Sequence, residues 1–260
     1  QYLQKCMPDA EIKVYLEQPP EIFRELKGYE EICSEFPEQP PFDVYFALDC
    51  GAERLGEAEK YFRSAEKKIN IDHHVSNTGT GDVNLVEPQI GSTCEVLYDL
   101  FDREKLDREI AKALYIGIIH DTGVFQYSNT TPETLKKGAE LISYGFDFPR
   151  MIQETFYQKT YVQTQIMGRA LMESIRFLDG RCIVSVVDKK TMDFYEVTPK
   201  DMDGIVNQLR NIEGISCAIF MYQTGTLEYK VSLRSDERVN VAEVASYFGG
   251  GGHARAAGCT

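Results

Sequence analysis

The sequence predicts an α/β protein: an N-terminal domain built on a mainly parallel sheet flanked by helices, followed by a smaller C-terminal α/β domain. Segments typical of strands and of helices alternate along the first half of the chain, as they do in βαβ units. A helical stretch follows, and three further apolar segments typical of strands come after it. We therefore expect a first domain at residues 1–155, a helical connector at 156–175, a second domain at 176–260, and a cleft between the two domains.

Apolar runs predict the strands of the first domain. Asp43–Leu48 is almost continuously apolar, which is typical of a strand buried on both faces of a parallel sheet. Glu11–Leu16 and Lys68–Ile71 are two further strand candidates. One helix begins at Pro132, with Thr131 as its N-cap. The spacing of apolar residues predicts the other helices at 54–62, 92–101 and 108–119.

The second domain is predicted to combine three strands with two helices, separated by turn residues. The strands are expected at 182–187, 215–220 and 229–233, and the helices at 201–210 and 240–248.

Composition excludes several classes of protein. No stretch approaches 18 apolar residues, so no transmembrane helix is expected. The net charge of −13 argues against long-duplex nucleic acid as a partner, but bound divalent ions would still allow a small anionic substrate. The seven scattered cysteines form no C-x-x-C pair, and the first residues are not a secretory signal. We therefore expect reduced thiols and a cytoplasmic protein, with no membrane contact.

Carboxylates and imidazoles follow two of the predicted strands. Asp49 comes directly after the first apolar run, and Asp72, His73 and His74 come directly after the Lys68–Ile71 strand. Ligands of open α/β sheets bind at this edge. Imidazole with carboxylate is the ligand set of a hydrolytic Mn²⁺, Zn²⁺ or Fe²⁺ site. The alternatives are a turn-capping aspartate and a chance histidine pair in a surface loop, and Asp72 could orient an adjacent imidazole instead of binding metal.

Two further motifs contain the remaining histidines. His120 and Asp121 follow a predicted helix; a helix C-terminus favours the histidine but not the acid, which makes Asp121 the stronger ligand candidate. Gly249–Gly252 precede His253, and small residues follow. If that loop leads into a helix, its backbone N–H groups would face an anion, and Arg234 could add a contact to phosphate. The alternatives are a flexible linker and an exposed arginine.

These motifs together resemble the DHH/DHHA1 phosphoesterases, and most closely their oligoribonuclease and pAp phosphatase group. The resemblance covers nearly the whole chain. It is carried by Asp49, Asp72-His73-His74, Asp121-Thr122-Gly123, Phe125-x-Tyr127-x-Asn129-Thr130 and the segment Gly249-Gly250-Gly251-Gly252-His253-x-x-Ala256-Ala257-Gly258.

The resemblance implies a role for each of these residues. Asp49 would bridge two Mn²⁺ ions, His73 and Asp121 would complete the shell of the second ion, and Asp72 would stand behind them. His74 would act as the catalytic donor beside the scissile phosphate. The second domain would bind the nucleotide through Arg234, Gly250, Gly251, Gly252 and His253. The substrate would be a short oligoribonucleotide or a small nucleotide, such as 3′-phosphoadenosine 5′-phosphate (pAp). A homodimer is compatible with this resemblance.

One departure from the family pattern affects the first ion. The family begins with a His-x-x-Pro-Asp-x-Asp motif that binds both metals, and the sequence contains none. We expect that the sequence is a fragment lacking this motif and a C-terminal segment, so that one ion site is incomplete and the fragment could be inactive. Two alternatives remain: a phosphodiesterase acting on cyclic or linear dinucleotides, and a non-catalytic nucleotide-binding protein with a degenerate metal site.

Overall fold

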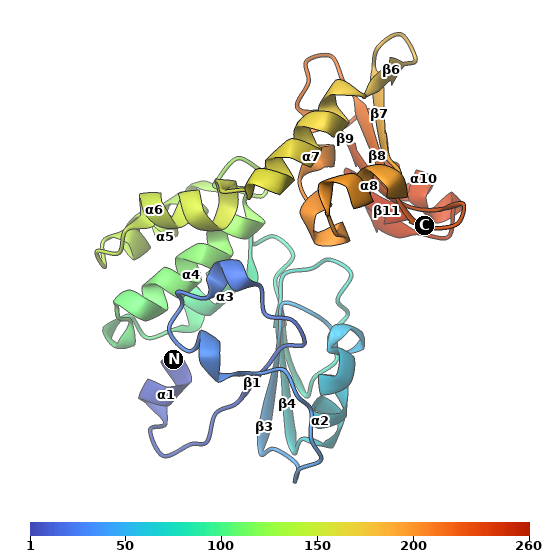
Figure 1. Cartoon of the computed structure of the whole chain (residues 1–260). Helices are drawn as coiled ribbons and strands as arrows, with labels where there is room; N and C mark the ends of the chain where they lie inside the picture. The colour runs from blue at the N-terminus through green and yellow to red at the C-terminus, as the bar shows by residue number, and fades with distance from the viewer. The chain divides into compact units, whose positions relative to one another are not determined.

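Three parallel strands form the main sheet of the first half of the chain: β3 (Val44–Leu48), β4 (Lys67–Asp72) and β5 (Val83–Val86). β4 is the central strand, and its last three residues are buried. The register pairs Leu48 with Ile71, so β3 and β4 end at the same edge of the sheet. A parallel sheet with helices packed beside it confirms the predicted α/β class (Figure 1).

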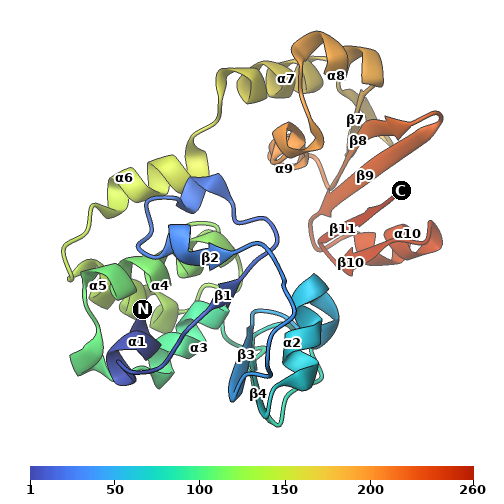
Figure 2. The same cartoon turned by 60° about the horizontal axis from the view of Figure 1, so that its bottom comes forward.

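The computed structural model describes residues 1–260, which divide into two compact units, Gln1–Gln158 and Lys159–Thr260. In the first unit, α2 lies on one side of the strands and the group around α3 and α4 on the other (Figures 1 and 2). None of the helices in the structure combines the length and the apolar composition that a membrane span requires. The helices of the first unit are α1 (Tyr2–Cys6), α2 (Glu59–Ser64), α3 (Thr93–Leu100), α4 (Arg108–Asp121), α5 (Pro132–Ile142) and α6 (Phe148–Ile152), which continues into a π-helical turn at Gln153–Tyr157.

Helix α4 forms the centre of the first unit's core. Ile110, Leu114 and Ile118 recur every four residues and are all buried, because residues at this spacing lie on one face of a helix. The start of α5 also follows the sequence: Thr131 caps it and Pro132 is its first residue, as predicted.

Two predicted elements of the first unit are shorter than expected. The strand expected at Glu11–Leu16 is limited to β1 (Val14–Tyr15), because its parallel partner β2 (Ile32–Cys33) has only two residues. The helix expected at 54–62 is divided into two 3₁₀ turns and α2, since Gly56 adopts a left-handed φ of 55° that interrupts a helix. Further 3₁₀ turns lie at Glu21–Phe23, Tyr29–Glu31 and Arg103–Lys105.

The second unit is built on one six-stranded sheet with the order β10-β11-β9-β8-β7-β6. Its strands pair antiparallel, except that β7 and β8 are parallel. The strands are β6 (Ile175–Phe177), β7 (Cys182–Val187), β8 (Cys217–Gly225), β9 (Glu228–Ser235), β10 (Gly251–His253) and β11 (Ala256–Cys259). The helices are α7 (Tyr161–Met172), α8 (Lys189–Tyr195), α9 (Ile205–Arg210) and α10 (Val241–Tyr247).

Strand β8 serves two hydrophobic cores because its side chains alternate between the faces of the sheet. Ala218 and Phe220 belong to the core that α7, α8 and α9 cover. Cys217 and Ile219 belong to the core against α10 on the other face. The helix predicted at 201–210 is divided into a 3₁₀ turn, Pro199–Met202, and α9, since Gly204 between them has a left-handed φ of 84°.

Candidate metal centre

The ends of β3 and β4 place two carboxylates side by side in the first unit. Asp49 follows β3 directly, and Asp72 is the last residue of β4. The backbone N–H of Asp49 donates to the carbonyl oxygen of Ile71 at 3.0 Å, which holds the two strand ends together. Asp49 has a left-handed φ of 62°, a conformation that aspartate adopts more readily than most residues and that is frequent at functional sites.

The ring of His73 faces two of the predicted ligands. Its Nε2 lies 3.5 Å from Oδ1 of Asp49 and 3.8 Å from Oδ2 of Asp121. Its Nδ1 lies 3.2 Å from the carbonyl oxygen of Ile90. A carbonyl oxygen can only accept, so Nδ1 carries a proton, and in the neutral ring Nε2 then has the lone pair that binds a metal. His73 Nε2 thus lies within 4 Å of a carboxylate oxygen of each of the other two predicted ligands.

Asp121 lies in the last turn of α4, not in a loop after the helix as predicted. A helix C-terminus disfavours negative charge. Burial and the neighbouring Asp49 raise the pKa of Asp121 to about 6. A divalent cation would relieve both effects, because positive charge beside a carboxylate favours its ionised form.

His120, the other residue of this motif, points elsewhere. Its Nε2 lies 3.2 Å from Oγ1 of Thr155, and its ring packs edge-on against Phe23 and Phe156. Burial lowers its pKa. These contacts indicate a packing role for His120.

Asp72 orients the two adjacent histidines by accepting hydrogen bonds from them. It is fully buried, and its Oδ1 accepts hydrogen bonds from the backbone N–H of His73 at 2.6 Å, the backbone N–H of His74 at 3.1 Å and Nδ1 of His74 at 2.7 Å. Its Oδ2 accepts from Nδ2 of Asn77 at 2.6 Å. Burial opposes the charge, but these hydrogen bonds outweigh it and hold the pKa of Asp72 below its usual range.

The donor atoms of four residues lie within 4.8 Å of one another: Asp49, Asp72, His73 and His74. This group, with Asp121 3.8 Å from His73, fits a divalent cation by its chemistry, because carboxylate oxygens and imidazole are ligands of such ions. The hydrogen bonds that Asp72 already accepts favour an orienting role for it and leave Asp49, His73 and Asp121 as the freer donors.

Sequence reasoning missed Thr93 and assigned no role to Asn129, although Asn129 lies in a motif that carries the family resemblance. Oγ1 of Thr93 donates to Oδ1 of Asp49 at 2.7 Å, and Nδ2 of Asn129 donates to the carbonyl oxygen of Asp121 at 3.1 Å. The spacing Ser92-x-x-Glu95 is a helix-start signal and could have located the turn before α3. Ser92 does cap that helix, accepting from the backbone N–H of Glu95.

The remaining predicted site residues lie in the sheet of the second unit. Arg234 on β9 pairs with Ala256 on β11, which in turn pairs with His253 on β10. Directly paired residues point to the same face of a sheet. The structure therefore brings Arg234 and His253 onto one face, with only the small side chain of Ala256 between them. Nε of Arg234 donates to Oδ1 of Asn207 at 3.0 Å, which fixes the guanidinium.

The helix expected after the glycine loop is wrong. Residues Gly251–His253 and Ala256–Cys259 form the antiparallel hairpin β10–β11. A Cβ at Gly250 or Gly252 would overlap the backbone of β11, so these two glycines allow close approach of the strands. A Cβ at Gly251 would meet no atom within 4 Å, which leaves this position open to a ligand.

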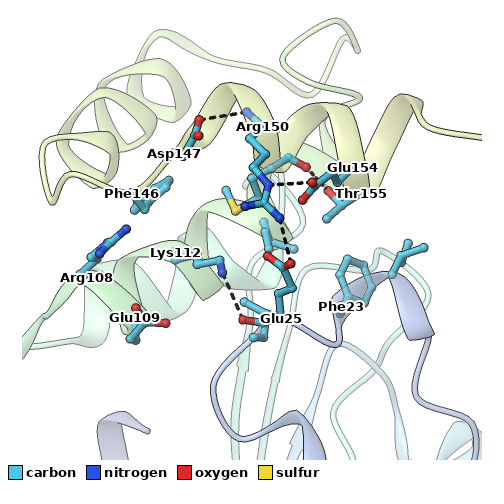
Figure 3. A pocket seen from close by; sticks show the side chains of 14 residues that line it. Phe23, Glu25, Arg108, Glu109, Lys112, Phe146, Asp147, Arg150, Glu154 and Thr155 are labelled. Carbon is cyan, nitrogen blue, oxygen red and sulfur yellow. Dashed lines mark hydrogen bonds and ion pairs between the residues drawn. The ribbon is translucent and has the colours of Figure 1, made fainter.

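The pocket in Figure 3 is lined by none of the predicted ligands. It lies in the first unit. Arg150 pairs there with Glu25 at 3.0 Å and with Glu154 at 2.7 Å, and Nζ of Lys112 donates to the carbonyl oxygen of Glu25. This pocket is therefore separate from the candidate metal ligands.

Two known protein families match parts of the chain. Residues 1–118 match the N-terminal domain of the DHH family, and residues 179–260 match the DHHA1 domain. The chain belongs to the DHH family of phosphoesterases, whose members are hydrolases, and carries a DHHA1 domain as its C-terminal part. The family resemblance inferred from the sequence is confirmed.

Two curated relatives carry the same name. The chain is 32% identical to the "bifunctional oligoribonuclease and PAP phosphatase NrnA" of Thermus thermophilus over 247 residues, covering 93% of this chain and 72% of that protein. It is 28% identical to the Bacillus subtilis protein of that name, covering 78% of this chain and 65% of that protein.

One solved structure shares the fold. An exopolyphosphatase-related protein from Bacteroides fragilis superposes with a TM-score of 0.89 at 24% identity, covering all of this chain and 80% of that one.

Proposed function

We propose that the protein is a Mn²⁺-dependent phosphoesterase that hydrolyses short oligoribonucleotides, pAp, or both. The observation that carries the proposal is the cluster of Asp49, His73 and Asp121, in which Nε2 of His73 lies 3.5 Å from Oδ1 of Asp49 and 3.8 Å from Oδ2 of Asp121. The names of the relatives from Thermus and Bacillus support the substrate class.

Each predicted site residue of the first unit has a role in this proposal. Asp49, His73 and Asp121 would hold Mn²⁺. When bound, divalent cations supply a water of lowered pKa and neutralise charge on the phosphate. Asp72 keeps the proton of His74 on Nδ1. It also orients the ring, so that His74 could pass a proton from Nε2 to the leaving oxygen.

Residues of the second unit would bind the nucleotide. Arg234 and His253 lie on one face of the sheet, and the Arg234 guanidinium is fixed by Asn207. A pre-oriented guanidinium can make two parallel hydrogen bonds to a phosphate. Gly251, where a side chain would meet no atom within 4 Å, leaves room for a ligand to approach the backbone of β10.

A substrate panel tests the proposal. The full-length protein with Mn²⁺ would be assayed on pAp, on oligoribonucleotides of two to five nucleotides, on longer RNA, on cyclic di-AMP and on pyrophosphate. We expect turnover of pAp or of the shortest RNAs, falling on long RNA. Preferred cleavage of a cyclic or linear dinucleotide would favour the phosphodiesterase alternative. Tight nucleotide binding without turnover would identify a non-catalytic binding protein.

The proposal also concerns the cellular compartment and the oligomeric state of the enzyme. We propose a cytoplasmic enzyme, because its seven cysteines are all free in the structure and reduced thiols are typical of the cytosol. A homodimer remains a prediction that measurement of the mass in solution would test.

A further inference from the structure

One short segment, residues 90–93, contacts two of the three predicted ligands directly. The carbonyl oxygen of Ile90 accepts a hydrogen bond from Nδ1 of His73 at 3.2 Å. Oγ1 of Thr93 donates to Oδ1 of Asp49 at 2.7 Å. The same four residues therefore fix the ring of one ligand and the carboxylate of another.

Asn129 connects this segment to the third predicted ligand. Its Nδ2 donates to the carbonyl oxygen of Gly91 at 2.9 Å and to the carbonyl oxygen of Asp121 at 3.1 Å. The Asp121 carbonyl lies in the last turn of α4, where backbone carbonyls lack partners within the helix. A side-chain amide has two N–H donors. Asn129 uses both, one on each of the elements that it joins.

The junction between the segment and Asn129 is closely packed. Residues 91–93 are all buried. A Cβ at Gly91 would lie 2.6 Å from Oε1 of Glu95 and 3.0 Å from the carbonyl oxygen of Asn129, so no larger residue fits without movement. Close packing of this kind transmits a displacement of one partner to the other.

We propose that segment 90–93 and Asn129 are positioning residues that set the separation of Asp49, His73 and Asp121 and thereby the affinity of the centre for a divalent cation. Groups behind metal ligands orient those ligands, and their loss lowers metal affinity. This inference rests on the proposed function for the choice of Mn²⁺ as the probe, and it does not depend on which nucleotide is the substrate.

The first test compares two asparagines of the same unit in the full-length protein. Asn129→Asp keeps the shape of the side chain but replaces its N–H donors by an oxygen that faces two carbonyl oxygens. Asn84→Asp is the matched control, because Asn84 is exposed and its Nδ2 bonds only the carbonyl oxygen of Gly81. We expect Asn129→Asp to weaken Mn²⁺ binding about 10- to 100-fold, measured by titration with electron paramagnetic resonance. The hyperfine pattern of the bound Mn²⁺ should change as well, and Asn84→Asp should change neither quantity.

A second pair of variants tests segment 90–93. It also tests the proposed effect on Mn²⁺ affinity if Asn129→Asp does not fold. Thr93→Val keeps the shape and removes the hydroxyl, whereas Thr93→Ser keeps the hydroxyl. We expect weaker Mn²⁺ binding in Thr93→Val and recovery in Thr93→Ser. Wild-type affinity in both Asn129→Asp and Thr93→Val would overturn the inference. A wild-type protein that binds Mn²⁺ but cleaves no nucleotide would contradict the proposed function alone.

Discussion

Nδ1 of His74 donates a hydrogen bond to Oδ1 of Asp72 at 2.7 Å, and the accepting carboxylate is fully buried. The bond fixes the tautomer and the orientation of the ring, because a carboxylate can only accept. Nε2 of His74 is consequently the nitrogen available for chemistry.

This relationship predicts that His74 serves turnover more than metal binding. A positioned general acid typically contributes about 10²- to 10⁴-fold to the rate. His74→Ala should therefore lower kcat by that order while Mn²⁺ remains bound. Steady-state kinetics with metal content measured by mass spectrometry would check this. Loss of Mn²⁺ from His74→Ala would instead identify His74 as a ligand.

Asp49 should be indispensable to the metal centre. Asp49→Ala removes a donor 3.5 Å from His73 Nε2, so we expect loss of Mn²⁺ and of activity. Asp43→Ala is the matched control, since Asp43 is exposed at the opposite end of the same strand. Calorimetric titration with Mn²⁺ distinguishes the two variants. Retained Mn²⁺ binding in Asp49→Ala would remove this residue from the site.

Asp121 should give the metal-free protein an unusual pH dependence. Its folded pKa of about 6 lies above the value of about 3.9 for an unfolded chain. The folded state therefore holds this proton more tightly, and its contribution to the free energy of unfolding is lost as pH rises from about 4 to about 6.

Urea unfolding in a chelator checks this dependence. The difference in stability between wild type and Asp121→Asn should shift against the wild type as pH rises through that window. Addition of Mn²⁺ should restore the wild type, because bound cations favour the ionised carboxylate. A difference that does not change with pH would contradict the assignment.

The second unit should affect nucleotide binding without affecting the metal. Loss of one charge-assisted hydrogen bond costs about 1.5–3 kcal/mol, or roughly tenfold to a hundredfold in affinity. Arg234→Ala and His253→Ala should raise KM by that order and keep Mn²⁺ content. Arg176→Ala, on the exposed edge strand β6, is the control. Equal loss of activity on a small chromogenic phosphodiester would show that the role in nucleotide binding is wrong.

Gly251→Val offers a cleaner test of ligand approach than its neighbours do. A side chain at Gly250 or Gly252 would break the hairpin, whereas one at Gly251 meets no atom of the protein within 4 Å. We therefore expect Gly251→Val to fold with wild-type stability and to bind pAp more weakly. Thermal unfolding and equilibrium binding measure the two quantities separately, and unchanged pAp affinity would argue against a ligand at β10.

Local sequence determined the parts of this structure that depend on near neighbours. The apolar run before Asp49 and the Thr131 cap are visible in the sequence, and both elements form where predicted. β3 is not buried on both faces as expected, however, since Val44 and Leu48 are exposed. The glycine loop was misjudged because the reason for its glycines, contact with β11, is not visible in the loop itself. Thr93 was missed for the same reason, since its partner Asp49 lies 44 residues away in the chain. Asn129 was part of a recognised motif, but its contact with the carbonyl oxygen of Asp121 was not foreseen.

The turn after α4 contains three successive left-handed residues: Gly123, Val124 and Phe125, with φ values of 58°, 55° and 63°. Such a conformation in a β-branched residue costs about 1–3 kcal/mol. Glycine at position 124 would remove this cost but also the contacts of the Val124 side chain with the core around α4. The same change would loosen the chain three residues beyond the helix end that presents Asp121. The residue at position 124 therefore balances backbone strain against packing and against the placement of the helix end that carries Asp121.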